Sequence, residues 1–397
     1  MRQKIKTFFL SSLFVLFANT AFTQNLVFSD SLSIGLITCS PGSEVYARFG
    51  HSGIRLLDHK SGLDVVFNYG IFDFNAPNFL VKFIRGETDY QLGAALTDDF
   101  LYEYRERNSS VTEQVLNLNE SEKINIANLL LKNYEPQNRI YRYNFVFDNC
   151  ATRPLLKISE GIDGKIIFAD ESSEITFRQW ISRHTGADSW LQFGIDMLFG
   201  ADADRLCTQS ESTFLPEVLM NLVENATIDN AETQRKLVYS NTLLVPKHLQ
   251  TAVKENFISS PSFITICILL IGLIIVFIEK RSKKYFRAFD FTLLLATSIA
   301  GMVLIFLMFF SEHPLVKHNL NVLWLNPLNI IAAILFFVRK TKRILAYYFL
   351  FCILLIIIVL AGSLFSFQVL NIAFFPIIAL LLIRYKCMAD NFFAKKN

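Results

Sequence analysis

Hydrophobic and polar positions divide the chain into two parts. Over residues 24–256 they alternate or recur at helical spacing, as in a water-exposed domain. After Pro261 they give way to long apolar runs. A helix rises about 1.5 Å per residue, so roughly 20 residues cross the hydrocarbon core of a membrane. We therefore expect an exported α+β domain followed by an α-helical membrane domain of about five transmembrane helices, over residues 262–278, 291–310, 322–338, 344–360 and 369–383.

Alternation in the first part predicts an antiparallel sheet with helices between its strands. A strand at 31–40 is followed by one that begins near His51, and residues 64–69 form its hairpin partner across the turn HKSGL. Residues 119–122 (NESE) cap a helix at 123–133. Further strands are expected at 90–96 and 111–118, a helix at 98–107, and mostly helices over 160–260.

The stretch YRYNFVFDNCATRPLL (141–156) carries the most specific local signal. Alternating aromatic residues run into Asp148-Asn149-Cys150, and Asp and Asn are good N-caps. This predicts Cys150 in the first turn of a helix, where free N–H groups and the helix dipole favour the thiolate. A small buried cysteine without chemistry is the alternative. Pro154 crowds the carbonyl of Cys150 in such a helix and predicts a kink.

Residues 1–23 have the pattern of a secretory signal. Basic Arg2, Lys4 and Lys6 precede the apolar run FFLSSLFVLF, with cleavage expected before Gln24. An uncleaved N-terminal anchor is the alternative, and both export the segment that follows. The loops EKRSKKYFR (279–287) and RKTKR (339–343) are strongly basic, and such loops stay in the cytoplasm. The charges thus predict an outside domain, five crossings and a cytoplasmic C-terminus.

The composition excludes several classes of protein but does not indicate a reaction. The chain is 52% hydrophobic, with 39 Phe among 397 residues, and its net charge is only +3. It has no glycine loop for phosphate, no basic aromatic surface for nucleic acid, and no CxxC or HExxH spacing for a metal. Three cysteines lie in the water-exposed part, so one stays unpaired in an oxidising compartment. Cys39 and Cys207 either form a bridge or are both buried thiols.

A nucleophilic thiol needs a base and a group that orients the base. Among His51, His59, His184 and His248, only His51 lies beside glycines on a strand that can pack against the cysteine. Asn68 on the partner strand is our choice for the orienting group, with Tyr69 and Asp73 as competitors. The N–H of Cys150 supplies one oxyanion donor.

The segment between the second and third apolar runs, SEHPLVKHNLNVLWLNPL (311–328), is unusually polar for membrane depth. The charge pattern places it on the same side as Cys150. Its polar groups either cap helices and bond across an interface or contact a substrate. They are His313, His318, Asn319, Asn321 and Asn326.

At these residues the chain resembles a known family. FGHSGIRLLD, FNYGIFDF and YNFVFDNCATR resemble the Lnb N-terminal periplasmic domain family, and the resemblance continues through TFRQW, GADADR, FLPEVL and HPLVKHNLNVLWLNPL. The family's fold is similar to a circularly permuted papain-like (NlpC-like) thiol enzyme, in which the histidine strand precedes the cysteine helix. The resemblance implies that His51 and Cys150 form the catalytic pair. The family includes membrane enzymes that N-acylate the terminal cysteine of diacylated lipoproteins.

We therefore expect four segments: a signal peptide (1–23), a papain-like catalytic domain (24–160), a mainly helical extension (161–260) and a transmembrane domain (261–397). The expected enzyme is a thiol acyltransferase of the inner membrane with its catalytic domain in the periplasm. A phospholipid is the expected acyl donor and a lipoprotein N-terminus the acceptor, without cofactor, metal or nucleic acid. A membrane-anchored cysteine amidase or peptidase of the cell wall and a non-enzymatic envelope scaffold are the alternatives. The residues expected to act are Cys150, His51 and Asn68 in catalysis and Asn149, Arg153, His313 and Asn321 in substrate binding.

Overall fold

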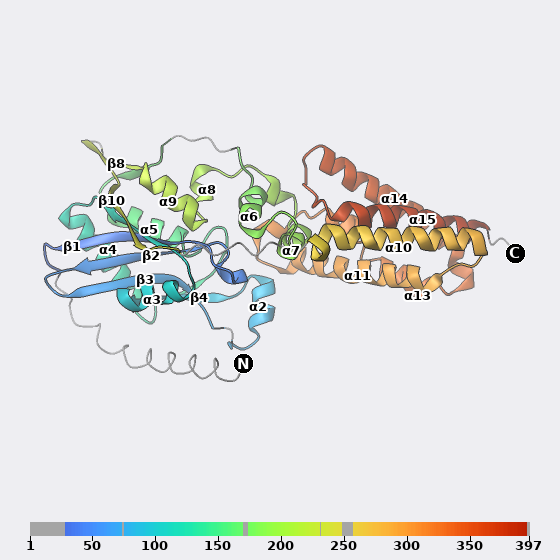
Figure 1. Cartoon of the computed structure of the whole chain (residues 1–397), viewed down its shortest axis with the longest axis horizontal. Helices are drawn as coiled ribbons and strands as arrows, with labels where there is room; N and C mark the ends of the chain where they lie inside the picture. Colours follow the sequence, from blue (N-terminus) through green and yellow to red (C-terminus); the bar gives the residue numbers. More distant parts are fainter. Residues whose placement is uncertain (1–27, 74, 170–173, 231, 248–256, 395–397) are drawn as a thin grey trace.

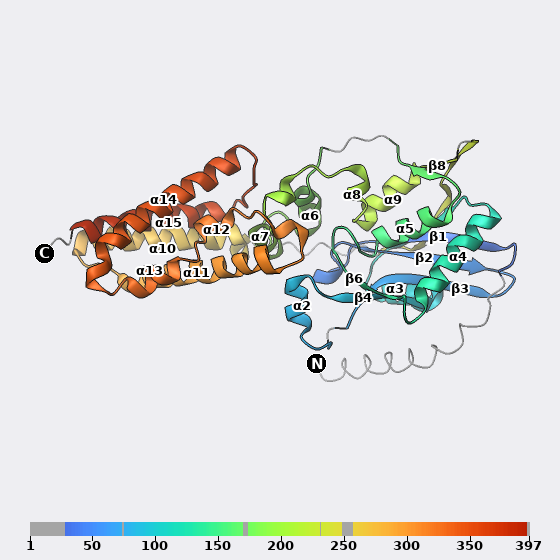
Figure 2. The ribbon, with the colours of Figure 1, turned by 180° about the vertical axis from the view of Figure 1, so that it is seen from behind.

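The computed structural model describes residues 28–73, 75–169, 174–230, 232–247 and 257–394, so the expected signal peptide lies outside the described residues. A mixed sheet-and-helix domain lies at one end of the molecule and a bundle of long helices at the other (Figures 1 and 2). The change from one to the other falls where the sequence changes character, at the start of α10 (Pro261–Ser282).

The domain is organised around a seven-stranded antiparallel sheet with strand order β10-β5-β1-β2-β3-β4-β6. Cys39 pairs with His51 across β1 and β2, and Gly53 pairs with Asn68 across β2 and β3, which confirms the predicted hairpin. The strands are β1 (Leu32–Cys39), β2 (His51–Asp58), β3 (Leu63–Ile71), β4 (Asp89–Leu96), β5 (Val111–Leu116), β6 (Ile140–Arg142) and β10 (Val238–Val245).

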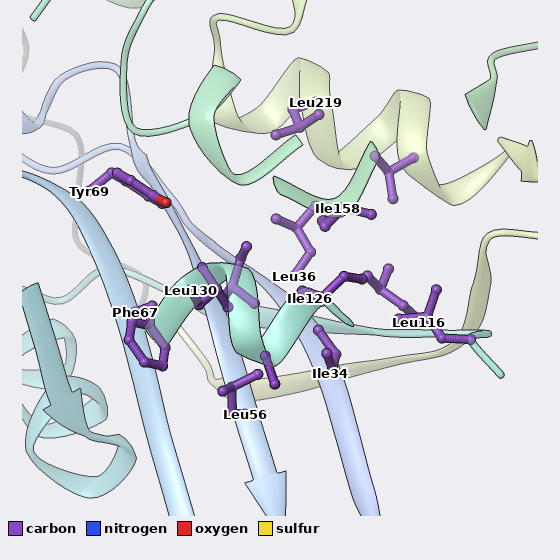
Figure 3. Close-up of a cluster of buried hydrophobic side chains, with 14 of the residues drawn as sticks. Ile34, Leu36, Leu56, Phe67, Tyr69, Leu116, Ile126, Leu130, Ile158 and Leu219 are labelled. Carbon is purple, nitrogen blue, oxygen red and sulfur yellow. The ribbon is translucent and has the colours of Figure 1, made fainter. Parts of the chain in front are cut away.

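Helices cover the sheet and close its main core. In Figure 3, Ile126 and Leu130 of α4 lie over the strand residues Ile34 and Leu56, with Ile158 of α5 beside them. The predicted capping box at the start of α4 is present, since the Asn119 side chain and Glu122 bond each other's backbone N–H groups. The helices around the sheet are α2 (Phe79–Arg85), α3 (Thr97–Glu106), α4 (Glu120–Tyr134) and α5 (Thr152–Gly161).

The prediction of a mainly helical segment over 161–260 was incomplete. Its described part also holds four strands, and β10 is hydrogen-bonded to β5 in the main sheet. The residues up to 160 therefore do not contain the whole sheet. Two of these strands, TIDN and TQRK, were not predicted, because neither shows the alternation of hydrophobic and polar residues that indicates a strand. The elements are β7 (Lys165–Ile167), α6 (Phe177–Thr185), α7 (Trp190–Leu198), η3 (Ala201–Asp204), α8 (Gln209–Ser212), α9 (Pro216–Glu224), β8 (Thr227–Asn230) and β9 (Thr233–Lys236).

Three described helices, α10, α11 and α14, are long and apolar enough to cross a membrane. The fifth predicted span, 369–383, only partly overlaps α15, which starts at Phe374, continues to Ala394 and carries charged residues in its second half. Besides α10 the helical region contains η4 (Phe257–Ser259), α11 (Arg287–Phe310), η5 (Pro314–Val316), α12 (Asn321–Trp324), α13 (Asn329–Leu335), η6 (Arg339–Thr341), α14 (Lys342–Leu364) and α15 (Phe374–Ala394).

The third predicted span, 322–338, is not one helix. It breaks between α12 and α13, where Pro327 has no N–H to donate and the Asn326 side chain accepts the N–H of Leu328 at 2.9 Å. A side chain at Gly301 of α11 would overlap the carbonyl of Leu325, so α11 packs directly against this break. Hydropathy alone did not show the break, because the leucines and isoleucines on both sides keep it high, although Pro327 in the middle of the run is a signal for a helix end.

Candidate functional site

His51 and Asn68 form the hydrogen bond that the sequence predicted for an imidazole and its orienting group. His51 begins β2 and Asn68 lies near the end of β3, and antiparallel pairing brings the two side chains together. The ring donates from Nε2 to the Asn68 side-chain oxygen. This bond fixes the tautomer and leaves Nδ1 as the ring nitrogen that can accept a proton. Tyr69 instead donates its hydroxyl to Asn133 at 2.6 Å, away from the ring.

Gly70 brings the thiol and the imidazole to one place. Its φ of +95° suits glycine, and a Cβ built on it would lie 3.6 Å from Cβ of Cys150 and 4.0 Å from Cε1 of His51. The cysteine and the histidine therefore flank the same small residue at the end of β3. Gly70 was not among the predicted site residues, although a glycine in FNYGIF, directly after a predicted strand, is a signal of close approach.

The turn that presents Cys150 differs from the predicted helix N-terminus. The helix α5 begins at Thr152, so Cys150 precedes its first turn and the dipole acts on it from a distance. Pro154 falls within the first turn, where no intrahelical N–H is needed, and the expected kink is absent.

Asn149 builds this turn. Its side-chain oxygen accepts the N–H groups of Ala151 at 2.8 Å and Thr152 at 3.0 Å, and its amide nitrogen donates to the carbonyls of Phe145 and Phe214. The residue is 2% exposed, and both ends of its amide are bonded. These contacts position Cys150, and a substrate contact by Asn149 stays a prediction.

Burial keeps both reactive groups neutral at rest. It raises the pKa of the Cys150 thiol to about 11, although the N–H groups of Ser52 and of Cys150 itself favour the thiolate. Burial also lowers the pKa of His51 to about 4, against the opposing effect of the Asn68 bond. The sequence-based expectation of a lowered thiol pKa was thus wrong, because desolvation outweighs the N–H groups. The thiolate forms only when a proton passes to His51.

A pH profile would test this neutral pair. Because His51 acts as a base only when unprotonated, activity is expected to be lost as the pH falls through about 4 rather than through 6.5, the ordinary value for histidine. Steady-state kcat/KM for the reaction of Cys150, measured from pH 3.5 to 9, would give the acid limb. An apparent pKa near 6.5 would contradict a buried, desolvated imidazole.

Substituting Asn68 would test its role as the orienting group. Asn68→Ala removes the acceptor of the Nε2 proton, so the ring can rotate or change tautomer, and we expect kcat to fall by about 10- to 100-fold with a smaller change in KM. Asn68→Asp keeps an acceptor oxygen and should move the acid limb of the pH profile to higher pH, because the carboxylate stabilises the imidazolium and raises the pKa of His51. Equal rates for wild type and Asn68→Ala would show that the bond is not needed.

Arg153 lies beside the site with its charge already paired. It bonds both carboxylate oxygens of Asp148, one at 2.7 Å, and its guanidinium lies 3.6 Å from the centre of the Tyr141 ring. It also lines a cavity of about 360 Å³ together with Leu155 and Leu156. A substrate contact by Arg153 stays a prediction.

His313 and Asn321 make the interface contacts that were one of the two expected roles of the outer loop. The ring of His313 bonds the carbonyl of Phe83 at 2.8 Å, at the end of α2. Asn321 is fully buried, donates to the carbonyls of Asp196 and Met197, and accepts from the indole of Trp324. These bonds fit the interface role, and a substrate contact by His313 or Asn321 stays a prediction.

The remaining histidines and cysteines lie elsewhere. His184 lines a cavity of about 1000 Å³, His59 lies in the exposed β2–β3 turn, and His248 lies outside the described residues. Cys39 and Cys207 are both free thiols, buried in different clusters, so the bridge considered for them is absent. Among the described residues, no three His, Cys, Asp or Glu side chains gather as metal ligands.

Two family models match the chain. The Lnb N-terminal periplasmic domain matches residues 19–183, which include His51 and Cys150, and the Lnb transmembrane domain, named as a five-helix unit, matches residues 253–396. No curated protein and no solved structure matches the chain. The two matches agree with the order of the domains and with the position of the site, and the chain belongs to the Lnb family.

Proposed function

We propose that this chain is a cysteine-dependent acyltransferase that moves an acyl chain from a phospholipid to the N-terminal amine of a diacylated lipoprotein. The observation that carries the proposal is that Cys150 and His51 both lie next to Gly70, with Asn68 bonded to the ring. The Lnb domains indicate a membrane protein with a periplasmic domain in lipoprotein biosynthesis.

In the first half-reaction, Nδ1 of His51 accepts the thiol proton and the thiolate attacks the ester carbonyl of the lipid. The C–S bond forms, and the N–H groups of Ser52 and Cys150, which approach the sulfur, are the nearest backbone donors for developing negative charge. His51 then gives its proton to the departing glycerol oxygen, which releases a lysophospholipid and leaves a thioester on Cys150.

In the second half-reaction, the α-amine of the lipoprotein's lipidated cysteine attacks the thioester. His51 accepts a proton from the nitrogen and returns it to the leaving thiolate, so the thiol and the neutral imidazole are restored. An amide bond forms and the thioester bond breaks, without a cofactor. A thioester suits this transfer because a thiolate leaves more readily than an alkoxide.

The membrane setting supports a lipid donor. The basic loops at 279–287 and 339–343 favour five crossings of the inner membrane, with the catalytic domain in the periplasm and the C-terminus inside. We also propose that the core has the permuted papain-like order, since the histidine strand β2 precedes the segment of Cys150. A wall amidase would use the same residues but would need only one anchor.

Mass spectrometry of a lipoprotein's N-terminal lipopeptide tests the function. Cells that lack this protein are complemented with wild type or with an empty vector, and wild type is expected to add one acyl mass to the terminal cysteine. Identical lipopeptides in the two strains would reject acyl transfer. An accompanying change in cell-wall peptides would instead favour the amidase.

A further inference from the structure

The short helix α2 exposes an unusual share of apolar side chains. Leu80 is 67% exposed, Val81 54%, Phe83 47% and Ile84 38%. A helix of seven residues has little stability of its own in water. So much apolar surface on one turn and a half of helix indicates contact with something apolar that is not part of the chain.

Contacts of α2 with the outer loop fix its place. The last three carbonyls of the helix, on Phe83, Ile84 and Arg85, each accept a hydrogen bond from the segment 311–313, at 2.8, 3.0 and 2.7 Å. Gly86, with φ +72°, lets the backbone of His313 approach closely. Because this segment directly follows α11, the helix α2 is held at the outer end of a membrane-spanning helix (Figures 1 and 2).

Other exposed apolar residues lie at the same level of the molecule. They come from the end of α11, from η4 just before α10, and from the start of α7, whose indole bonds the carbonyl of Ser259 at 2.8 Å. The start of a helix that runs inward, such as α10, and the end of one that runs outward, such as α11, both lie at the outer membrane surface, where aromatic residues collect. These residues are Trp190, Phe257, Ile258, Phe309 and Phe310, each more than half exposed.

A row of aromatic rings connects α2 with the thiol. Ring centres are 6.0 Å apart from Phe83 to Phe79, 5.8 Å from Phe79 to Phe72, 4.8 Å from Phe72 to Tyr90 and 4.1 Å from Tyr90 to Tyr143. Tyr90 belongs to the main hydrophobic cluster of the domain, and Tyr143 and Cys150 both pack against this cluster. The strand that carries Asn68 and Gly70 also leads directly into α2.

We propose that α2 is an interfacial helix whose apolar side chains lie in the outer leaflet, and that it places the thiol at the bilayer surface where a donor phospholipid presents its ester. Lys82 in its last turn suits the phosphates of lipid headgroups, whereas Arg85 is paired with Glu87. The role in delivering the donor rests on the proposed acyltransferase function. The docking of α2 on lipid rests only on the exposed residues and on the position of the helix.

Photo-crosslinking of the full-length protein in liposomes of phosphatidylethanolamine and phosphatidylglycerol tests the docking. Benzoyl-phenylalanine is placed at Leu80, at Val81 or at Tyr239, in a Cys150→Ala background that cannot transfer acyl groups. Tyr239 is the control, because it is 78% exposed but lies at the end of β10 that pairs near Leu116, away from the histidine end of the sheet. Lipid adducts are expected at 80 and 81, about fivefold or more above 239. Equal yields, or adducts to protein alone, would overturn the docking.

The role of α2 in delivering the donor phospholipid is tested by measuring the rate at which the acyl-enzyme forms from phospholipid in a bilayer. Replacing both Leu80 and Val81 with Gln is expected to slow it about tenfold, because two aliphatic side chains leave the leaflet, while Tyr239→Gln leaves it unchanged. Alkylation of Cys150 by soluble iodoacetamide should keep its rate in both variants, which shows an intact site. Unchanged acyl-enzyme formation in the double variant would overturn the delivery role. If wild type forms no acyl-enzyme, the proposed function fails, and the adducts still decide whether α2 docks on lipid.

Discussion

Cys150→Ala is expected to abolish lipoprotein N-acylation while the protein still accumulates in the membrane. In the proposed mechanism this thiol forms the covalent acyl intermediate, so kcat should fall by about 10⁴-fold or more. The residue is partly exposed and small, and the turn around it is held by Asn149 rather than by its sulfur. Lipopeptide mass spectrometry of complemented cells, with immunoblotting for protein amount, measures both effects.

Controls separate chemistry from folding. Cys267→Ala removes an equally small thiol from α10, far from His51 in the chain and in the fold, and should leave N-acylation intact. His51→Ala should cost nearly as much as Cys150→Ala, and the double variant should be no worse than either, since the two residues act as one unit. Residual N-acylation by Cys150→Ala would show that another group carries the acyl chain.

The elements around the site could be predicted because their signals are local. Alternation located β1, β2 and β3, and the HKSGL turn paired β2 with β3, which brought His51 next to Asn68. The capping sequence after Leu118 located α4. Pairing within a hairpin depends on residues that are neighbours in the sequence, so a pattern of period two is sufficient.

Features that depend on long-range contacts could not be predicted. The pKa of Cys150 is set by burial under segments far along the chain, so a cap motif gave the wrong direction. Asn149 bonds the carbonyl of Phe214, 65 residues away, and this bond makes it a structural residue. Similarly, the side-chain amide of Asn321 donates to carbonyls of α7. The sequence alone does not show whether a polar residue at membrane depth bonds protein or substrate.

The contacts of the motifs TFRQW and GADADR could not be predicted either. The two motifs are bonded to each other and to the segment before α15, which are far apart in the sequence. Arg178 from the first motif is 4% exposed and bonds Asp204 from the second, together with Asp196 of α7. Its second terminal nitrogen reaches the carbonyls of Phe199 and Gly200. Asp196 in turn accepts a hydrogen bond from the side-chain amide of Asn371 at 2.8 Å, and Asp204 accepts one from the N–H of Val369 at 3.1 Å. Both donors lie in the loop before α15. The guanidinium of Arg178 thus supports one part of the contact between the periplasmic domain and the membrane helices, beside the contacts of His313 and Asn321.

Arg178→Leu is therefore expected to destabilise this contact by about 3–5 kcal/mol, because it leaves two buried carboxylates without a cation. The expected result is a lower thermal inactivation midpoint in nanodiscs and new protease cleavage between the periplasmic domain and the first membrane helix. Arg205→Leu is the matched control, since Arg205 pairs with Glu211 at the surface, where such a pair contributes about 0–1 kcal/mol. Adding Asp196→Asn and Asp204→Asn to Arg178→Leu should recover part of the loss by removing the unpaired charges. If Arg178→Leu and Arg205→Leu had the same midpoint, the buried network would not hold the two domains together.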